Sequence, residues 1–170
     1  MPREVAAIEA GVLGLGVIGG TIAQALAAQG FAVRGYARHA KRIDGVRCFD
    51  ADAGLPAFLD GLDLLVCIVP ATPATEGILD RTTLAYLADG AHLVNIGRGA
   101  ALVEADLLPL LDSGKLSGAT LDVFRTEPLP ADHPFWRRTD ITLTPHVSGM
   151  TLPAETVGRN DSAMLSMNGS

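Results

Sequence analysis

The 170-residue sequence has no surplus of positive charge and no long apolar run. Its 13 Lys and Arg residues are outnumbered by 19 Asp and Glu residues, and the formal net charge is −6 at pH 7. Binding along nucleic-acid phosphates needs a basic surface, so this balance argues against a nucleic-acid partner. Glycines interrupt the apolar stretch after Ala10, and no segment approaches the roughly 18 apolar residues of a membrane span. Glu4 and Glu9 stand where a signal peptide carries positive charge, so we expect a soluble, cytoplasmic protein with no membrane partner.

Cysteine is also scarce, and its two positions do not suggest a disulfide framework. Cys67 lies inside the apolar run of residues 64–69, and Cys48 ends a short strand-like stretch. Packed, reduced thiols are the ordinary state of such residues in a cytosolic protein. The sequence has no internal repeat and no linker, and its length suits one domain with a sizeable core. No metal site is expected.

Short apolar runs alternate with segments of helical periodicity along most of the chain. In the segment 18–29, Ile22, Ala25, Leu26 and Gln29 recur at helical spacing, and Gly30 follows as a C-terminal cap. Alternation of this kind predicts an α/β fold with a doubly wound parallel sheet. The predicted strands are residues 11–15, 32–37, 46–49, 62–69, 91–96, 118–124 and 141–143, and the predicted helices are residues 18–29, 82–88 and 104–111.

A glycine-rich turn joins the first predicted strand to the first predicted helix. Gly14, Gly16 and Gly19 form a G-x-G-x-x-G pattern, which is weak alone but has physical meaning between a strand and a helix. The first glycine permits a tight turn, the second lets a pyrophosphate approach the backbone, and the third lets the helix pack close to the strand. The helix N-terminus, at Val17 and Ile18, then offers free N–H groups to phosphates. The turn therefore predicts dinucleotide binding, with a turn that binds nothing as the alternative.

The end of the second predicted strand lacks the acidic residue that usually bonds the ribose 2′-hydroxyl of NAD. Residues 36–42 read Tyr-Ala-Arg-His-Ala-Lys-Arg instead. A 2′-phosphate carries nearly two negative charges, which Arg38 and Lys41 would attract. We therefore expect a preference for NADP(H), with Arg38 as the main contact and NAD(H) still possible. A solvated basic loop is the alternative.

Three polar residues of complementary chemistry follow later predicted strands. Arg98 comes after the strand 91–96, Glu127 after the strand 118–124, and His146 after the strand 141–143. Arginine can grip a substrate carboxylate and polarise a keto oxygen, histidine can donate a proton, and a carboxylate can orient the imidazole. Reduction of a 2-keto acid needs that set. Taken singly, a surface charge or a capping group is a serious alternative for each residue.

Several motifs together resemble the D-2-hydroxyacid dehydrogenases. They include Asn95-x-x-Arg98-Gly99, the segments 102–108, 111–116 and 118–124, Glu127-Pro-Leu-Pro, and Thr144-Pro-His146. The likeness covers about residues 11–157. Within the family the sequence is most similar to the glyoxylate/hydroxypyruvate reductase A group, judged by residues 152–155, Pro134-x-Trp136-Arg137 and the basic loop at Arg38.

The resemblance implies a role for each matching position. Arg98 would bind the substrate carboxylate and keto oxygen, His146 would be the acid–base, and Glu127 would be its partner. Asp122 would contact the nicotinamide carboxamide. Gly97 stands where alanine is commoner, a change that we expect to matter little. The residues expected to contact the cofactor are Gly14, Gly16, Val17, Ile18, Gly19, Arg38, Lys41, Val69, Pro70, Thr75, Ile96 and Asp122.

The resemblance also implies a second domain. Family members build the active site between this domain and a substrate domain made from a long N-terminal segment and a C-terminal helix. We expect residues 1–157 to form the dinucleotide-binding domain and residues 158–170 a tail or the remnant of that helix. We further expect a homodimer, a small 2-keto or 2-hydroxy acid as substrate, and little or no reductase activity from this chain alone.

Two alternatives have different consequences. The chain could be a catalytically inactive nucleotide-sensing module, like the transcriptional corepressors that share this family. It could also be a Rossmann domain of other chemistry, such as a methyltransferase, in which the set of Arg98, Glu127 and His146 would be unexpected.

Overall fold

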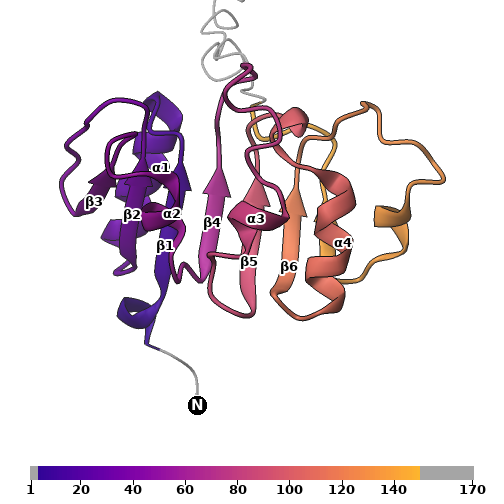
Figure 1. The fold of residues 1–170 in the computed structure, drawn as a ribbon, viewed down its shortest axis with the longest axis horizontal. Coiled ribbons are helices and arrows are strands. Elements are labelled where there is room, and N and C mark those ends of the chain that lie inside the picture. Colours follow the sequence, from indigo (N-terminus) through magenta and orange to yellow (C-terminus); the bar gives the residue numbers. More distant parts are fainter. Residues whose placement is uncertain (1–3, 150–170) are drawn as a thin grey trace, which may run out of the picture.

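This computed structural model describes residues 4–149. Seven strands within this range form a parallel sheet at the centre of the protein (Figure 1). The strand order is β3-β2-β1-β4-β5-β6-β7, so the winding reverses between β1 and β4. The predicted doubly wound α/β fold is thus confirmed. The strands are β1 (Glu9–Leu13), β2 (Ala32–Tyr36), β3 (Val46–Phe49), β4 (Leu64–Cys67), β5 (Ala91–Asn95), β6 (Leu116–Leu121) and β7 (Ile141–Leu143).

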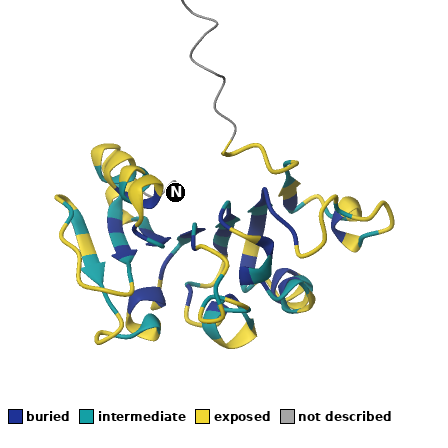
Figure 2. Cartoon of the chain, turned by 90° about the horizontal axis from the view of Figure 1, so that it is seen from above, coloured by how far each residue is buried: buried dark blue, intermediate teal, exposed yellow. Residues whose placement is uncertain are grey.

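Helices cover the two faces of the sheet unequally. Figure 2 shows α1 on one face, and α2, α3 and α4 along the opposite face. Helix α1 contacts β1, β2 and β3, whereas α4 contacts β6. The helices are α1 (Val17–Ala28), α2 (Leu55–Leu59), α3 (Arg81–Leu84) and α4 (Glu104–Asp112), with the short 3-10 helices η1 (Val5–Ala7), η2 (Gly99–Ala101) and η3 (Pro134–Arg137).

Apolar side chains fill both sides of the sheet. The larger buried cluster lies on the face of α2, α3 and α4 and includes Phe58, Leu93 and Leu107, none of which has exposed surface. The smaller cluster packs α1 against the sheet through Val12 and Ala23. Central strands buried on both faces explain why the sequence shows nearly continuous apolar runs rather than alternation.

Helix α1 starts and ends one residue earlier than predicted, and only part of the predicted set of residues faces the sheet. Gly19 and Ala23 are its buried residues, whereas Ala25 and Gln29 are exposed. Ile22 and Leu26, two of the four residues at the predicted helical spacing, are half-buried and pack against the smaller cluster. Gly30 has a φ of +93°, as expected of a C-terminal cap.

Other helix and strand boundaries also differ from the predicted ones. Helix α2 was not predicted, and α3 ends at Leu84 although the predicted helix extended to residue 88. Strands β1 and β6 each begin two residues before the predicted starts, and β4 is shorter than the apolar run 62–69. The apolar residues beyond β4 continue into the buried loop around Val69 rather than into the sheet.

The remaining general expectations concern thiols, membranes and the tail. Cys48 and Cys67 are free cysteines, and Cys67 is buried. Among residues 4–149, no helix has the length and apolar character needed to cross a membrane. The predicted tail at residues 158–170 lies outside the described residues.

Candidate active site

The three glycines of the G-x-G-x-x-G turn differ in the space that surrounds them. Gly14 has a φ of +108°, and a Cβ on Gly19 would lie 1.8 Å from the carbonyl oxygen of Gly14. Glycine is therefore required at these two positions by the backbone itself. A Cβ on Gly16 would meet nothing within 4 Å. Since the fold does not need glycine at position 16, the open space beside it is available to a ligand.

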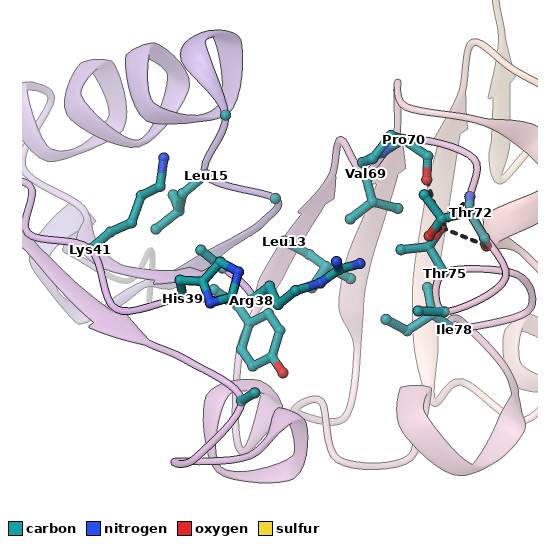
Figure 3. Close-up of a pocket in the computed structure, with 16 residues that line it drawn as sticks. Leu13, Leu15, Arg38, His39, Lys41, Val69, Pro70, Thr72, Thr75 and Ile78 are labelled. Atoms are coloured by element: carbon teal, nitrogen blue, oxygen red, sulfur yellow. Dashed lines mark hydrogen bonds between the residues drawn. The ribbon is translucent and has the colours of Figure 1, made fainter.

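A pocket of about 560 Å³ opens at this turn, where the chain leaves β1, β2 and β4 (Figure 3). Its place beside the reversal in strand order is where doubly wound sheets bind ligands. Among the predicted cofactor positions, those that line it are Gly14, Gly16, Arg38, Lys41, Val69, Pro70 and Thr75.

The wall after β2 is basic. Arg38, His39 and Lys41 are exposed residues that line the pocket, and no acidic residue is among its lining residues. Figure 3 shows Arg38 extending across the pocket towards Ile78, while Lys41 lies on the side of Leu15. The residues present thus fit a nucleotide with a phosphate near the end of β2.

The opposite wall is a loop fixed by its own hydrogen bonds. The Thr75 hydroxyl donates to the carbonyl oxygen of Pro70 at 2.6 Å, and it accepts from the backbone N–H of Thr72 at 3.0 Å. These bonds, drawn in Figure 3, hold Val69 and Pro70 at the rim of the pocket. Thr75 therefore has a structural function besides any contact to a ligand.

Arg98 follows β5 on a loop held by a buried amide. Asn95 has no exposed surface; its Oδ1 accepts from the N–H of Gly97 at 3.2 Å, and its Nδ2 donates to the carbonyl oxygen of Arg98 at 3.2 Å. The Arg98 side chain is exposed and donates to the carbonyl oxygen of Gly97 at 2.7 Å. A Cβ on Gly97 would lie 2.8 Å from the Val69 nitrogen. The absence of a side chain at Gly97 therefore lets the Arg98 loop pack closely against the backbone of Val69, which we did not expect from the sequence.

Glu127 and His146, which are 19 residues apart, are brought together. The Nδ1 atom of His146 lies 2.8 Å from Glu127 Oε2, and Glu127 Oε1 accepts from the N–H of Phe124 at 2.9 Å. The bond from His146, followed by that from Phe124, holds the pKa of Glu127 below its usual range. An ionised carboxylate only accepts, so Nδ1 carries the hydrogen and Nε2 is the free ring nitrogen. His146 has a φ of +55°, which sets the direction of its side chain.

A second pocket, of about 500 Å³, lies beside this pair. Glu127 and His146 form its polar part, and Trp136 and Leu143 belong to its apolar wall. The Trp136 indole N–H donates to the carbonyl oxygen of Pro130 at 2.8 Å, and 54% of the residue is exposed. The expected imidazole and carboxylate therefore border a mainly apolar hollow.

The other predicted cofactor positions lie outside both pockets. Val17 and Ile18 are 89% and 62% exposed in the first turn of α1. Gly19 is buried in α1, and Ile96 is half-buried after β5. Asp122 follows β6 and is 1% exposed. The contacts proposed for these five positions stay predictions.

Sequence reasoning missed several contributors. Tyr36, Ala51 and Ile78 line the first pocket without belonging to any recognised motif. Tyr36 ends β2, so its position before the basic loop was the available signal. Asn95 lay within a quoted motif, but its burial and its bonds to the Arg98 loop are tertiary properties.

Comparison with known proteins places these features in context. The sequence model of the family described as "D-isomer specific 2-hydroxyacid dehydrogenase, NAD binding domain" matches residues 1–148. The glyoxylate/hydroxypyruvate reductase A of Serratia proteamaculans is 54% identical over 117 residues, which are 69% of this chain and 37% of that protein. The chain therefore spans about a third of the length of this curated relative.

Solved structures agree in sequence and shape. A D-isomer specific 2-hydroxyacid dehydrogenase from Xanthobacter autotrophicus Py2, crystallised with NADPH and MES, has a TM-score of 0.85 and 44% identity, covering 90% of this chain and 63% of that one. An NADPH-dependent glyoxylate/hydroxypyruvate reductase from Sinorhizobium meliloti, crystallised with NADP and sulfate, has a TM-score of 0.83 and 44% identity, covering 86% and 48%.

Proposed function

The chain belongs to the D-isomer specific 2-hydroxyacid dehydrogenases and carries their NAD-binding domain, and we propose that it binds NADP(H) in the pocket that Gly16 lines. A full-length protein with this domain would reduce a small 2-keto acid of the glyoxylate or hydroxypyruvate type and would form a homodimer. The observation that carries the proposal is the combination of open space at Gly16 with a basic, acid-free wall at Arg38 and Lys41.

The preference for NADP(H) follows from charge. An acidic residue after β2 would repel a 2′-phosphate, whereas Arg38 can bind it bidentately and Lys41 can add a point charge. Neither cation forms an ion pair with another residue between 4 and 149, so both are available to a phosphate. Two structures similar to this chain were solved with NADPH or NADP, which supports the same assignment.

The chain's own residues suit carbonyl reduction. Bound nicotinamide would supply the hydride for the keto carbon. Arg98 would hold the substrate carboxylate and polarise the keto oxygen, at the end of β5. His146 would donate the Nε2 proton to that oxygen, because Nδ1 is engaged by Glu127. Glu127 would stabilise the protonated ring until the transfer.

Nucleotide titration of the 170-residue chain tests the cofactor assignment. Arg38→Ala removes a bond between charged groups, a loss of about 1.5–3 kcal/mol. The Kd for NADPH should therefore rise about 10–150-fold, while the Kd for NADH changes by less than about three-fold. Fluorescence of the reduced nicotinamide reports both.

Arg42→Ala is the matched control, because Arg42 is an exposed arginine of the same loop that does not line the pocket. It should leave both dissociation constants within about two-fold of the wild-type values. If Arg38→Ala weakens NADPH and NADH equally, the 2′-phosphate assignment is wrong.

A further inference from the structure

Glu104 is an acidic residue outside the two pockets described above that contacts the loop of Glu127. It is the first residue of α4, and only 18% of its side chain is exposed. The first turn of a helix favours an acidic side chain, because the helix N-terminus carries a partial positive charge. The contacts that Glu104 makes in the folded chain point to a further role.

The carboxylate of Glu104 holds the backbone that leads to Glu127. Its Oε1 accepts from the N–H of Arg125 at 3.0 Å. Within residues 4–149, this is the only hydrogen bond that ties the backbone of residues 124–127 to another part of the chain. The other bond of this segment is local and runs from the N–H of Phe124 to Glu127 Oε1 at 2.9 Å. Loss of the Glu104 carboxylate would therefore leave the segment without an outside backbone bond.

Gly99 packs against the same peptide. A Cβ on Gly99 would lie 2.0 Å from the carbonyl oxygen of Phe124 and 2.6 Å from the nitrogen of Arg125. The backbone of η2 is therefore in direct contact with the Phe124–Arg125 peptide, and the Glu104 bond fastens the peptide there. The Arg125 side chain also donates to Glu76 at 3.1 Å, but both groups are exposed, and such pairs contribute little.

The second oxygen of Glu104 faces a histidine. Glu104 Oε2 lies 3.6 Å from His133 Nε2, and His133 Nδ1 accepts from the N–H of Phe135 at 3.3 Å. Because Nδ1 accepts, the ring hydrogen is on Nε2 and faces the carboxylate. The His133 ring also packs on Phe135, with the ring centroids 4.4 Å apart. One oxygen of Glu104 is thus placed beside a packed ring, which leaves the other directed at Arg125.

We infer that Glu104 is a positioning residue: by holding the Phe124–Arg125 peptide against η2, it places the Glu127 carboxylate within bonding distance of His146. Its importance for reduction rests on the proposed function, but the positioning is a property of the chain itself. The segment 98–104 then has two functions, because it carries Arg98 at one end and holds the loop of Glu127 at the other.

The pKa of Glu127 distinguishes an effect of position from an effect of charge. Bonds from His146 and from the Phe124 N–H hold this pKa below its usual range, so displacement of the loop should raise it. Loss of the Glu104 charge acts in the opposite direction, because removal of a nearby negative charge favours the ionised form of Glu127. A rise in the pKa of Glu127 therefore reports a change of position.

Glu104→Ala in the 170-residue chain removes both the acceptor and the charge. Titration of the Glu127 carboxyl carbon by ¹³C NMR should show its pKa rising towards the value of an ordinary glutamate. Hydrogen exchange at the Arg125 amide should accelerate about ten-fold or more, because a bond to a charged group is lost. The Gly97 amide, which donates to a different side chain, should keep its wild-type rate.

Three further variants separate reach from charge. Glu104→Gln keeps an acceptor oxygen at the same reach, so the pKa of Glu127 should stay at or below its wild-type value. Glu104→Asp keeps the charge but is one methylene shorter, so the pKa should rise as in Glu104→Ala. Asp106→Asn is the matched control, because Asp106 lies in the same helical turn and accepts from the N–H of Arg81 rather than of Arg125. It should not raise the pKa of Glu127.

A pKa of Glu127 that stays at its wild-type value in Glu104→Ala would overturn the inference, whether or not the Arg125 amide exchanges faster. An equal rise in Glu104→Gln and Glu104→Ala would overturn it as well. If Glu104→Ala does not fold, Glu104→Asp decides the question by the same criterion. Failure of the wild-type chain to bind NADPH would refute the proposed function, whereas the titration of Glu127 would still decide the positioning.

Discussion

Replacing Gly16 with alanine should separate ligand binding from folding. A Cβ at this position meets nothing within 4 Å, and the φ of −70° is open to any residue. Alanine at this N-cap position should therefore cost at most about 1 kcal/mol of stability. For a chain of this length, that lowers the midpoint of thermal unfolding by roughly 2–4 °C.

The effect on nucleotide binding should be much larger. The methyl group would occupy the space through which a pyrophosphate reaches the N-terminus of α1. Losing one or more hydrogen bonds to a charged phosphate costs about 1.5–3 kcal/mol, which raises the Kd for NADPH about 10–150-fold. Fluorescence titration and thermal unfolding of the same sample give both quantities.

Gly19→Ala is the comparison variant, in which the loss of stability should be the larger one. Its Cβ would lie 1.8 Å from the carbonyl oxygen of Gly14, so helix and turn must separate. Overpacking of this kind costs about 1–3 kcal/mol or more, and thermal unfolding should move down by roughly 4–10 °C. The reasoning about the pocket is refuted if Gly16→Ala binds NADPH within about two-fold of wild type.

Three further outcomes follow from burial and charge. Phe58→Ala should lower the free energy of unfolding in urea by about 3–5 kcal/mol, because Phe58 is fully buried; a loss below about 1 kcal/mol would contradict the described packing. The pKa of Asp122 is lowered from 3.8 to about 2, so its ionised carboxylate contributes about 2 kcal/mol to the free energy of unfolding. This contribution is present above roughly pH 4 and is lost as the pH falls towards 2. Urea unfolding at pH 5 and pH 3 should show less acid destabilisation in Asp122→Asn than in wild type. Burial raises the pKa of Cys67 to about 11, so a thiol reagent at pH 8 should modify Cys48 and reach Cys67 only after unfolding.

The strands were the part of the fold most accessible to sequence reasoning. Buried parallel strands produce uninterrupted apolar runs, and β3 and β7 were predicted to the residue. Helix α2 was not predicted because a segment of five residues, with a proline near its start, is too short to show a helical period. In α1, apolar periodicity identified Ile22 and Leu26, which pack against the smaller cluster, but it missed Gly19 and Ala23, which are the buried residues of the helix.

Some features of the candidate site depend only on neighbouring residues in the sequence, whereas others depend on the tertiary fold. The glycine turn and the missing acid after β2 are local, so Gly16 and Arg38 could be named as candidate cofactor positions from the sequence alone, and both line one pocket. The approach of Glu127 to His146 depends on how β6 and β7 lie side by side, which spacing alone does not reveal. For the same reason, the sequence alone did not reveal that both oxygens of Asp122 bind the turn after β7.

Asn95 and Asp122 show how the ends of two neighbouring strands fix the backbone of two loops. The N–H of Asp122 donates to the carbonyl oxygen of Asn95 at 3.0 Å, so the ends of β5 and β6 are tied together. From these ends, the Asn95 amide holds the loop of Arg98, and the Asp122 carboxylate holds the turn of His146. Buried polar groups tolerate few arrangements, because each unmade bond costs about 1–3 kcal/mol. The backbone positions of Arg98 and His146 are therefore set by bonds within this chain.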